Sequence, residues 1–172
     1  ADGIIINDGG TMKTIPVSDL KTYTQTATSL NDLTDVLSED NSLYLGNNPS
    51  STTSTAEYNV AVGITALDAV TTGDKNTAVG HDALSNNTTG SFNSALGWYA
   101  LFRNTTGTWN SAVGLKAMED NTTGQSNSAL GTFSLKDNTT GSGNSALGYG
   151  ALESNISANN NTAVGYNALA DN

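Results

Sequence analysis

The chain has 172 residues and a net charge of −10, with six Lys and Arg residues, one histidine (His81) and no cysteine. The acidic balance disfavours binding to phosphate backbones, the lack of cysteine excludes disulfides and thiolate zinc sites, and one histidine cannot form a histidine cluster. We therefore expect no catalytic residue, no metal ligand, no cofactor and no nucleic-acid partner. Apolar runs of only a few residues also predict no membrane partner.

Small polar residues and glycine fill the chain. The sequence contains 25 Thr, 22 Asn, 18 Ser and 18 Gly, about half of all residues. Such a composition is typical of disordered chains. Here the polar residues recur in strict register, which favours an ordered repeat instead.

Residues 1–40 lack this register and are predicted to form a small N-terminal connector. Residues 4–6 and 12–17 flank the turn sequence Asn7-Asp8-Gly9-Gly10, which predicts a β-hairpin. Ser18 suits the N-cap of a short helix. Farther along, three leucines are spaced for one apolar face of a short helix or turn: Leu30, Leu33 and Leu37. We expect the connector to join the repeats to a preceding part of the protein.

Residues 41–172 form the predicted repeat region. A pentapeptide Asn-(Ser/Thr)-Ala-(Val/Leu)-Gly recurs every 17 residues, beginning at Asn76, Asn93, Asn110, Asn127, Asn144 and Asn161, with a variant copy at Asn59. Residues 41–58 read as a degenerate first coil, in which Ser42 to Gly46 keep the phase. Residues 59–172 give seven coils, of which the last stops at its twelfth position, and we expect the natural chain to continue.

The period indicates the fold. Counted from the repeat asparagine as position 1, positions 3 and 8 are almost always Ala, position 4 is Val or Leu, position 9 is Leu or Met, and positions 12–15 read Asn-Thr-Thr-Gly. Seventeen residues are too few for a helix–turn–helix repeat, and this glycine content is poor helix chemistry. We predict an all-β parallel β-solenoid with two short strands per coil, at positions 1–5 and 8–9, and a corner at positions 12–15.

Stacked coils make residues 17 apart into vertical neighbours. The spacing predicts an amide ladder at position 12, formed by Asn87, Asn104, Asn121, Asn138 and Asn155, and an apolar ladder at position 9, formed by Leu84, Leu101, Met118, Leu135 and Leu152. It also places Arg103 below Asp120 and stacks two aromatic pairs, Phe92 on Trp109 and Tyr149 on Tyr166.

The coils contain little apolar volume, so we expect identical chains to associate side by side. The Val/Leu column at position 4 and the Leu column at position 9 are predicted to meet neighbouring chains around an axis. Aromatic residues and one arginine gather within 18 residues and are candidates for this interface or for contact with a receptor, with an unpartnered ladder as a third possibility: Phe92, Trp98, Tyr99, Phe102, Arg103 and Trp109.

Residues 89–97 (TGSFNSALG) resemble the head repeats of trimeric autotransporter adhesins. Residues 161–169 (NTAVGYNAL), together with the upstream segments 6–13 and 29–36, resemble bacteriophage tail-fibre proteins, particularly those of marine and cyanobacterial phages. These resemblances imply a left-handed β-roll in an intertwined homotrimer, an extracellular location on the virion, and contacts with other fibre or virion proteins on the N-terminal side.

The leading hypothesis is therefore a non-enzymatic, homotrimeric tail-fibre segment that supports or performs attachment to a host-surface glycan or protein. The alternative is a bacterial trimeric adhesin head, which shares the fold and differs in its anchor. Two further hypotheses are less favoured. Regular Thr columns at positions 13 and 14 suit an ice-binding solenoid, and a depolymerising tailspike would need a catalytic cleft that the regular repeat does not offer.

Overall fold

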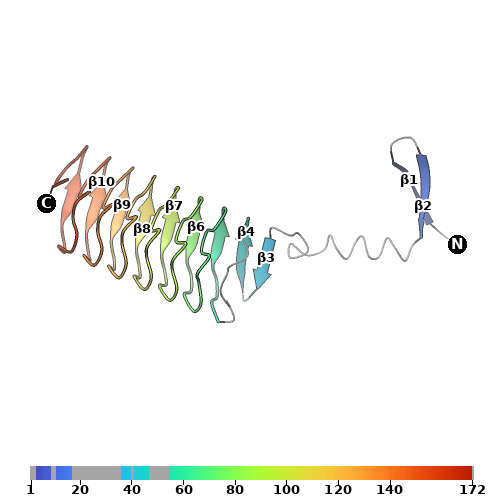
Figure 1. Cartoon of the computed structure of the whole chain (residues 1–172), viewed down its shortest axis with the longest axis horizontal. Helices are drawn as coiled ribbons and strands as arrows, with labels where there is room; N and C mark the ends of the chain where they lie inside the picture. Colours follow the sequence, from blue (N-terminus) through green and yellow to red (C-terminus); the bar gives the residue numbers. More distant parts are fainter. Residues whose placement is uncertain (1–2, 9–10, 17–35, 40, 47–54, 172) are drawn as a thin grey trace.

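The computed structural model describes residues 3–8, 11–16, 36–39, 41–46 and 55–171. All elements in this part of the chain are β-strands, and none is a helix (Figure 1). The strands are β1 (Gly3–Asp8), β2 (Thr11–Pro16), β3 (Val36–Glu39), β4 (Ser42–Leu45), β5 (Val60–Val62), β6 (Thr77–Val79), β7 (Ser94–Leu96), β8 (Ser111–Val113), β9 (Ser128–Leu130), β10 (Ser145–Leu147) and β11 (Thr162–Val164).

Coils of 17 residues stack into a parallel β-solenoid, as the repeat predicts (Figure 1). Strands β4 to β11 pair in parallel and in sequence order, and each pair joins residues 17 apart. For example, Ser94 pairs with Ser111 and Ala95 pairs with Ala112. Equivalent positions therefore form columns that run along the rod.

Each of these coils contains one strand, not the two that were predicted. The strand covers positions 2–4, whereas positions 6–11, which include the Ala-Leu pair, form a turn. Leu101 at position 9 has a φ of 53°, in the left-handed region that a β-strand does not use. The turn still bonds to its neighbours, since the Leu84 amide donates to the Ala100 carbonyl over 3.0 Å.

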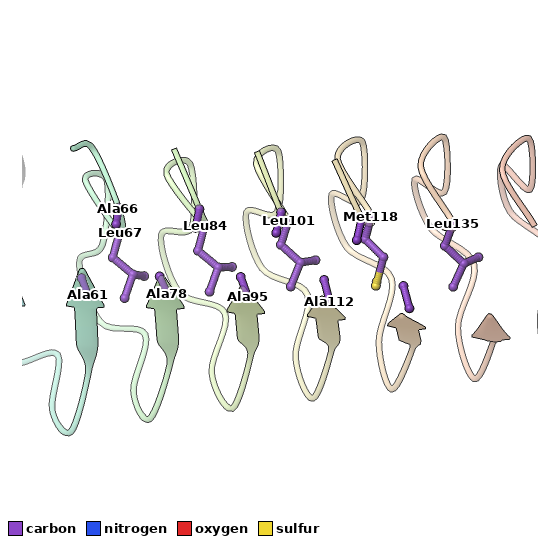
Figure 2. Packing of buried hydrophobic residues seen from close by; sticks show 14 of the residues in the cluster. Ala61, Ala66, Leu67, Ala78, Leu84, Ala95, Leu101, Ala112, Met118 and Leu135 are labelled. Carbon is purple, nitrogen blue, oxygen red and sulfur yellow. The ribbon is translucent and has the colours of Figure 1, made fainter. Parts of the chain in front are cut away.

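The core lies inside the coils (Figure 2). Alanines at position 3, such as Ala95, project inward from the strand, and Leu101 and its equivalents project toward them from the opposite wall. The position 9 residues from Leu67 to Leu152 are fully buried within a single chain. The prediction that this column faces neighbouring chains was therefore wrong, because the left-handed conformation at position 9 turns the side chain into the coil. Ser134, which replaces Ala at position 8, donates its hydroxyl to the Gly131 carbonyl over 2.8 Å.

Glycine at position 5 lets the chain leave the strand. Gly97 has a φ of 140°, and a Cβ added there would lie 2.3 Å from the carbonyl oxygen of Gly114 in the next coil. The position therefore requires both an unusual backbone conformation and a close approach between coils.

The first coil is closed by an antiparallel pair. Strand β3 pairs with β4, Val36 opposite Leu45, at the end of the nine-stranded sheet. Tyr44 occupies the alanine column and is fully buried, so a large ring fills the interior where the coils begin. Repeat arrays need such a cap because the first coil has no neighbour on one side.

Near the N-terminus, β1 and β2 pair as an antiparallel hairpin, with Ile5 opposite Thr14. The predicted helix start at Ser18 and the leucines Leu30 and Leu33 lie outside the described residues. Leu37 belongs to β3, so a strand stands where the leucine spacing suggested a helix or turn.

Candidate functional surface

Two ladders of buried asparagines hold the coils in register. At position 12, the Asn104 side-chain amide donates to Asn87 Oδ1 over 2.8 Å and to the Gly107 carbonyl of its own coil over 3.1 Å. At position 1, the Asn93 backbone amide donates to Asn76 Oδ1 over 2.9 Å, and Asn93 Nδ2 donates to the Gly107 carbonyl over 2.8 Å. The Gly107 carbonyl thus joins the two ladders within one coil.

The corner at positions 13–15 gathers donors around one carbonyl. The Thr105 oxygen accepts from the backbone amides of Thr88, Thr89 and Gly90, at 3.0 to 3.3 Å, and from the Thr88 hydroxyl at 3.1 Å. The position 13 hydroxyls of four further coils donate to the next coil in the same way. The hydroxyls of this Thr column therefore bond neighbouring coils to each other.

The outer face of the parallel sheet carries an apolar column at position 4. Strand residues alternate, with the central alanine buried and its two neighbours directed outward. Leu96 and Leu130 are each 50% exposed, and the same column contains Val62, Val79, Val113, Leu147 and Val164. We call these seven residues the apolar stripe.

Between coils, the stripe is hollowed into a shallow groove. Leu130, Leu147 and Val164 line a groove of about 190 Å³, together with Ser128, Ser145 and the strand residues Ala146 and Ala163. A row of valine and leucine side chains with small residues beside it suits close packing against another apolar surface.

The aromatic candidates fall into two groups. In the first, the Tyr99 ring lies 4.6 Å from the Trp98 ring and 4.6 Å from the Phe102 ring, measured between centroids. Lys116 Nζ lies within 6 Å of the Trp98 and Tyr99 ring centroids. Arg103, next along the chain, pairs with Asp120 over 3.3 Å. The Tyr99 ring thus contacts both of its neighbours, while Trp98 stays 47% exposed.

In the second group, Phe92 and Trp109 belong to a column at position 17. Their rings stack with centroids 5.7 Å apart and planes inclined by 27°. Lys75, one coil before Phe92, places Nζ 4.9 Å from the Phe92 ring centroid and 5.8 Å from that of Tyr58. The column therefore runs Tyr58, Lys75, Phe92, Trp109, and Trp109 is 58% exposed.

Two side chains of this region, Tyr99 and Lys136, have raised pKa values. Partial burial, together with the adjacent Asp82 carboxylate, raises the pKa of Tyr99. A 2.6 Å hydrogen bond to Asp137 raises the pKa of Lys136, and the carboxylates of Asp120 and Glu119 add to the rise. Lys136 thus pairs with an acid of its own coil.

The position 1 asparagines were not predicted to be a buried ladder. Their invariance in every coil was visible, since Asn opens each copy from Asn59 to Asn161. The direction of the side chain was not visible, because an asparagine just before a strand is also a common turn residue.

Among the described residues, no group of three or more His, Asp or Glu side chains is placed to hold a metal ion. The same residues include no helix long and apolar enough to cross a membrane. Comparisons of the chain with models of protein families, with curated proteins and with solved structures found no match in any of the three.

Proposed function

We propose that this chain is a non-enzymatic structural and adhesive segment of a homotrimeric fibre of the phage tail-fibre type. In this role it lies outside the cell, extends from the virion, and supports or performs attachment to a host-surface glycan or protein. Other fibre or virion proteins would adjoin it on the N-terminal side.

The apolar stripe is the observation that supports the proposal. Its seven side chains line up along one face of the rod, and a single chain leaves several of them about half exposed. Contiguous apolar surface of this kind is uncommon on monomeric proteins and marks a contact surface. Identical chains packed in parallel around an axis would cover it with the same column of each neighbour.

The stripe supports the association of chains, whereas the number three rests on the resemblance to trimeric adhesin heads and tail fibres. The stacked coils suit an extended fibre, because each coil adds about 4.8 Å to the rod and contacts only its neighbours.

Cysteine cross-linking tests the arrangement, and the wild-type chain has no cysteine to interfere. In a parallel trimer in register, the three copies of residue 96 lie around the axis. A short three-armed maleimide should therefore convert Leu96→Cys into a covalent trimer. Asn86→Cys, at an exposed position in the turn, is the matched control and should remain a single chain. Equal cross-linking of both variants, or of neither, would contradict the proposal.

A further inference from the structure

We propose that the open face of the Trp109 indole is a binding platform for a neutral carbohydrate ring, such as a hexose or N-acetylhexosamine within a glycan. The platform deepens the adhesive role proposed above and rests on it for its biological context, while its chemistry is argued from the position 17 column alone.

One face of the Trp109 indole is covered by a ring of the preceding coil. Phe92 stacks on that face at 5.7 Å, and the column continues through Lys75 to Tyr58. Because residues 17 apart succeed one another along the rod, the second face of the indole is directed toward the next coil. The indole is therefore held in place before any ligand arrives, which reduces the entropy lost on binding.

The second face is not covered by another ring. The next residues in the column are Ser126 and Gly143, and only then comes Asn160. Asn160 reaches back along the rod, since its Oδ1 lies 2.5 Å from the place where a Cβ on Gly143 would be. We call the stretch of the column between the indole and the Asn160 amide, which holds only Ser126 and Gly143, the notch. Because the Asn160 amide lies beside Gly143, two coils from Trp109, the notch spans about two coil spacings, roughly 10 Å.

The surroundings of the notch are polar and uncharged. No charged residue occurs between Asp120 and Lys136, or between Asp137 and Glu153. Gln125 at position 16 is exposed beside the notch, and its backbone amide is already bonded to Ser142 Oγ over 3.0 Å. The Gln125 side chain makes no hydrogen bond within the described residues, so its amide is available for a ligand.

These features match the chemistry of a neutral sugar ring. Its C–H face packs on an aromatic face, and its hydroxyl groups bond to side-chain amides and hydroxyls. An anionic ligand would find no cation in the notch, and a purely apolar ligand would leave the Gln125 and Asn160 amides without partners. Sites of this type combine an apolar wall with a few polar groups that fix orientation.

The test uses the intact assembled chain with Trp98→Phe, which leaves Trp109 as the only tryptophan. Maltotriose, cellotriose and chitotriose are titrated while the Trp109 fluorescence is recorded, and ligand-observed saturation-transfer NMR gives an independent readout. We expect a saturable change with at least one of the three. Trp109→Ala, which the NMR readout follows because no tryptophan remains, should weaken that binding by about tenfold or more, since it removes the stacking face.

Ser126→Tyr is the decisive variant. Tyr58 and Phe92 show that the same column and φ accept an aromatic residue, so the variant should fold and add one more stacked ring. That ring covers the indole face and should abolish binding, with the far-UV circular dichroism and melting temperature unchanged or raised.

Three results would overturn the platform: no saturable binding of any trisaccharide, binding that survives Ser126→Tyr, or a Trp109 shielded from acrylamide in the assembled chain. The last would identify an interchain contact. The mass of the same sample separates the two proposals. A trimer without sugar binding removes only the platform, whereas a monomer that binds sugar removes only the fibre assembly.

Discussion

Buried asparagines form two ladders of side-chain hydrogen bonds between neighbouring coils. The position 12 ladder could be predicted, because a 17-residue period makes Asn87 and Asn104 vertical neighbours whatever the exact coil shape. The position 1 ladder could not, because its formation depends on Asn93 pointing inward just before β7. That direction is set by the path of the whole coil.

Asn104→Ala should destabilise the fold by about 3 kcal/mol, since it removes three hydrogen bonds and leaves Asn87 Oδ1, the Gly107 carbonyl and Asn121 Nδ2 each without one partner in a buried site. Urea denaturation measures the change at fixed protein concentration. Asn86→Ala, at an exposed asparagine, is the matched control and should cost no more than about 1 kcal/mol. Equal losses in the two variants would mean that the ladder contributes little.

Tyr99 and Lys136 predict a loss of stability at alkaline pH. Both folded pKa values are raised, from ordinary values of 10.0 and 10.5. A raised folded pKa means that the folded state holds its proton more tightly, so the contribution is complete below about pH 10 and is lost as the pH rises through the folded values. Denaturation midpoints from pH 8 to pH 11 should therefore fall. The midpoint of Tyr99→Phe should fall less steeply with pH than the midpoint of Tyr166→Phe, the control at an exposed tyrosine. Identical pH profiles of the two variants would contradict the assignment.

At the scale of elements, the sequence predicted a strand at positions 1–5 and its register, and the structure places that strand at positions 2–4, but the turn that follows was not predicted. Ala-Leu pairs such as Ala100-Leu101 have the composition of a short strand. No local sequence pattern predicts that the backbone of a leucine adopts the left-handed conformation. That conformation costs about 1–2 kcal/mol per residue and is favoured here only because it buries the leucine against the facing alanines. It is a tertiary effect, outside the reach of local propensity.

Leu101→Ala should destabilise the fold by about 2–5 kcal/mol, because it opens a cavity in a core that is one side chain thick. Leu101→Met is the matched control, since Met118 fills the same position in the next coil, and its cost should stay below about 1.5 kcal/mol. Denaturant unfolding compares the two. A small loss in the alanine variant would show that the coil collapses onto the alanine columns.

For the whole molecule, the repeat predicted that the apolar columns at positions 4 and 9 would both face neighbouring chains. The structure leaves only one of these two columns exposed. The position 9 column is enclosed within its own coil, whereas the position 4 column remains as the apolar stripe. Sequence could not separate them, because both are columns of apolar residues with the same period. Only the burial pattern of a folded coil shows which column stays exposed on a single chain.

The mass of the folded wild-type chain in solution tests the central claim most directly. Light scattering after gel filtration, on a sample whose circular dichroism shows β-structure, should give a species of three chains, or about 53 kDa from three times 17.6 kDa. A folded species at the mass of one chain would contradict the account. The apolar stripe would then be a surface that a single chain tolerates in water, and the proposed fibre would lose its interface.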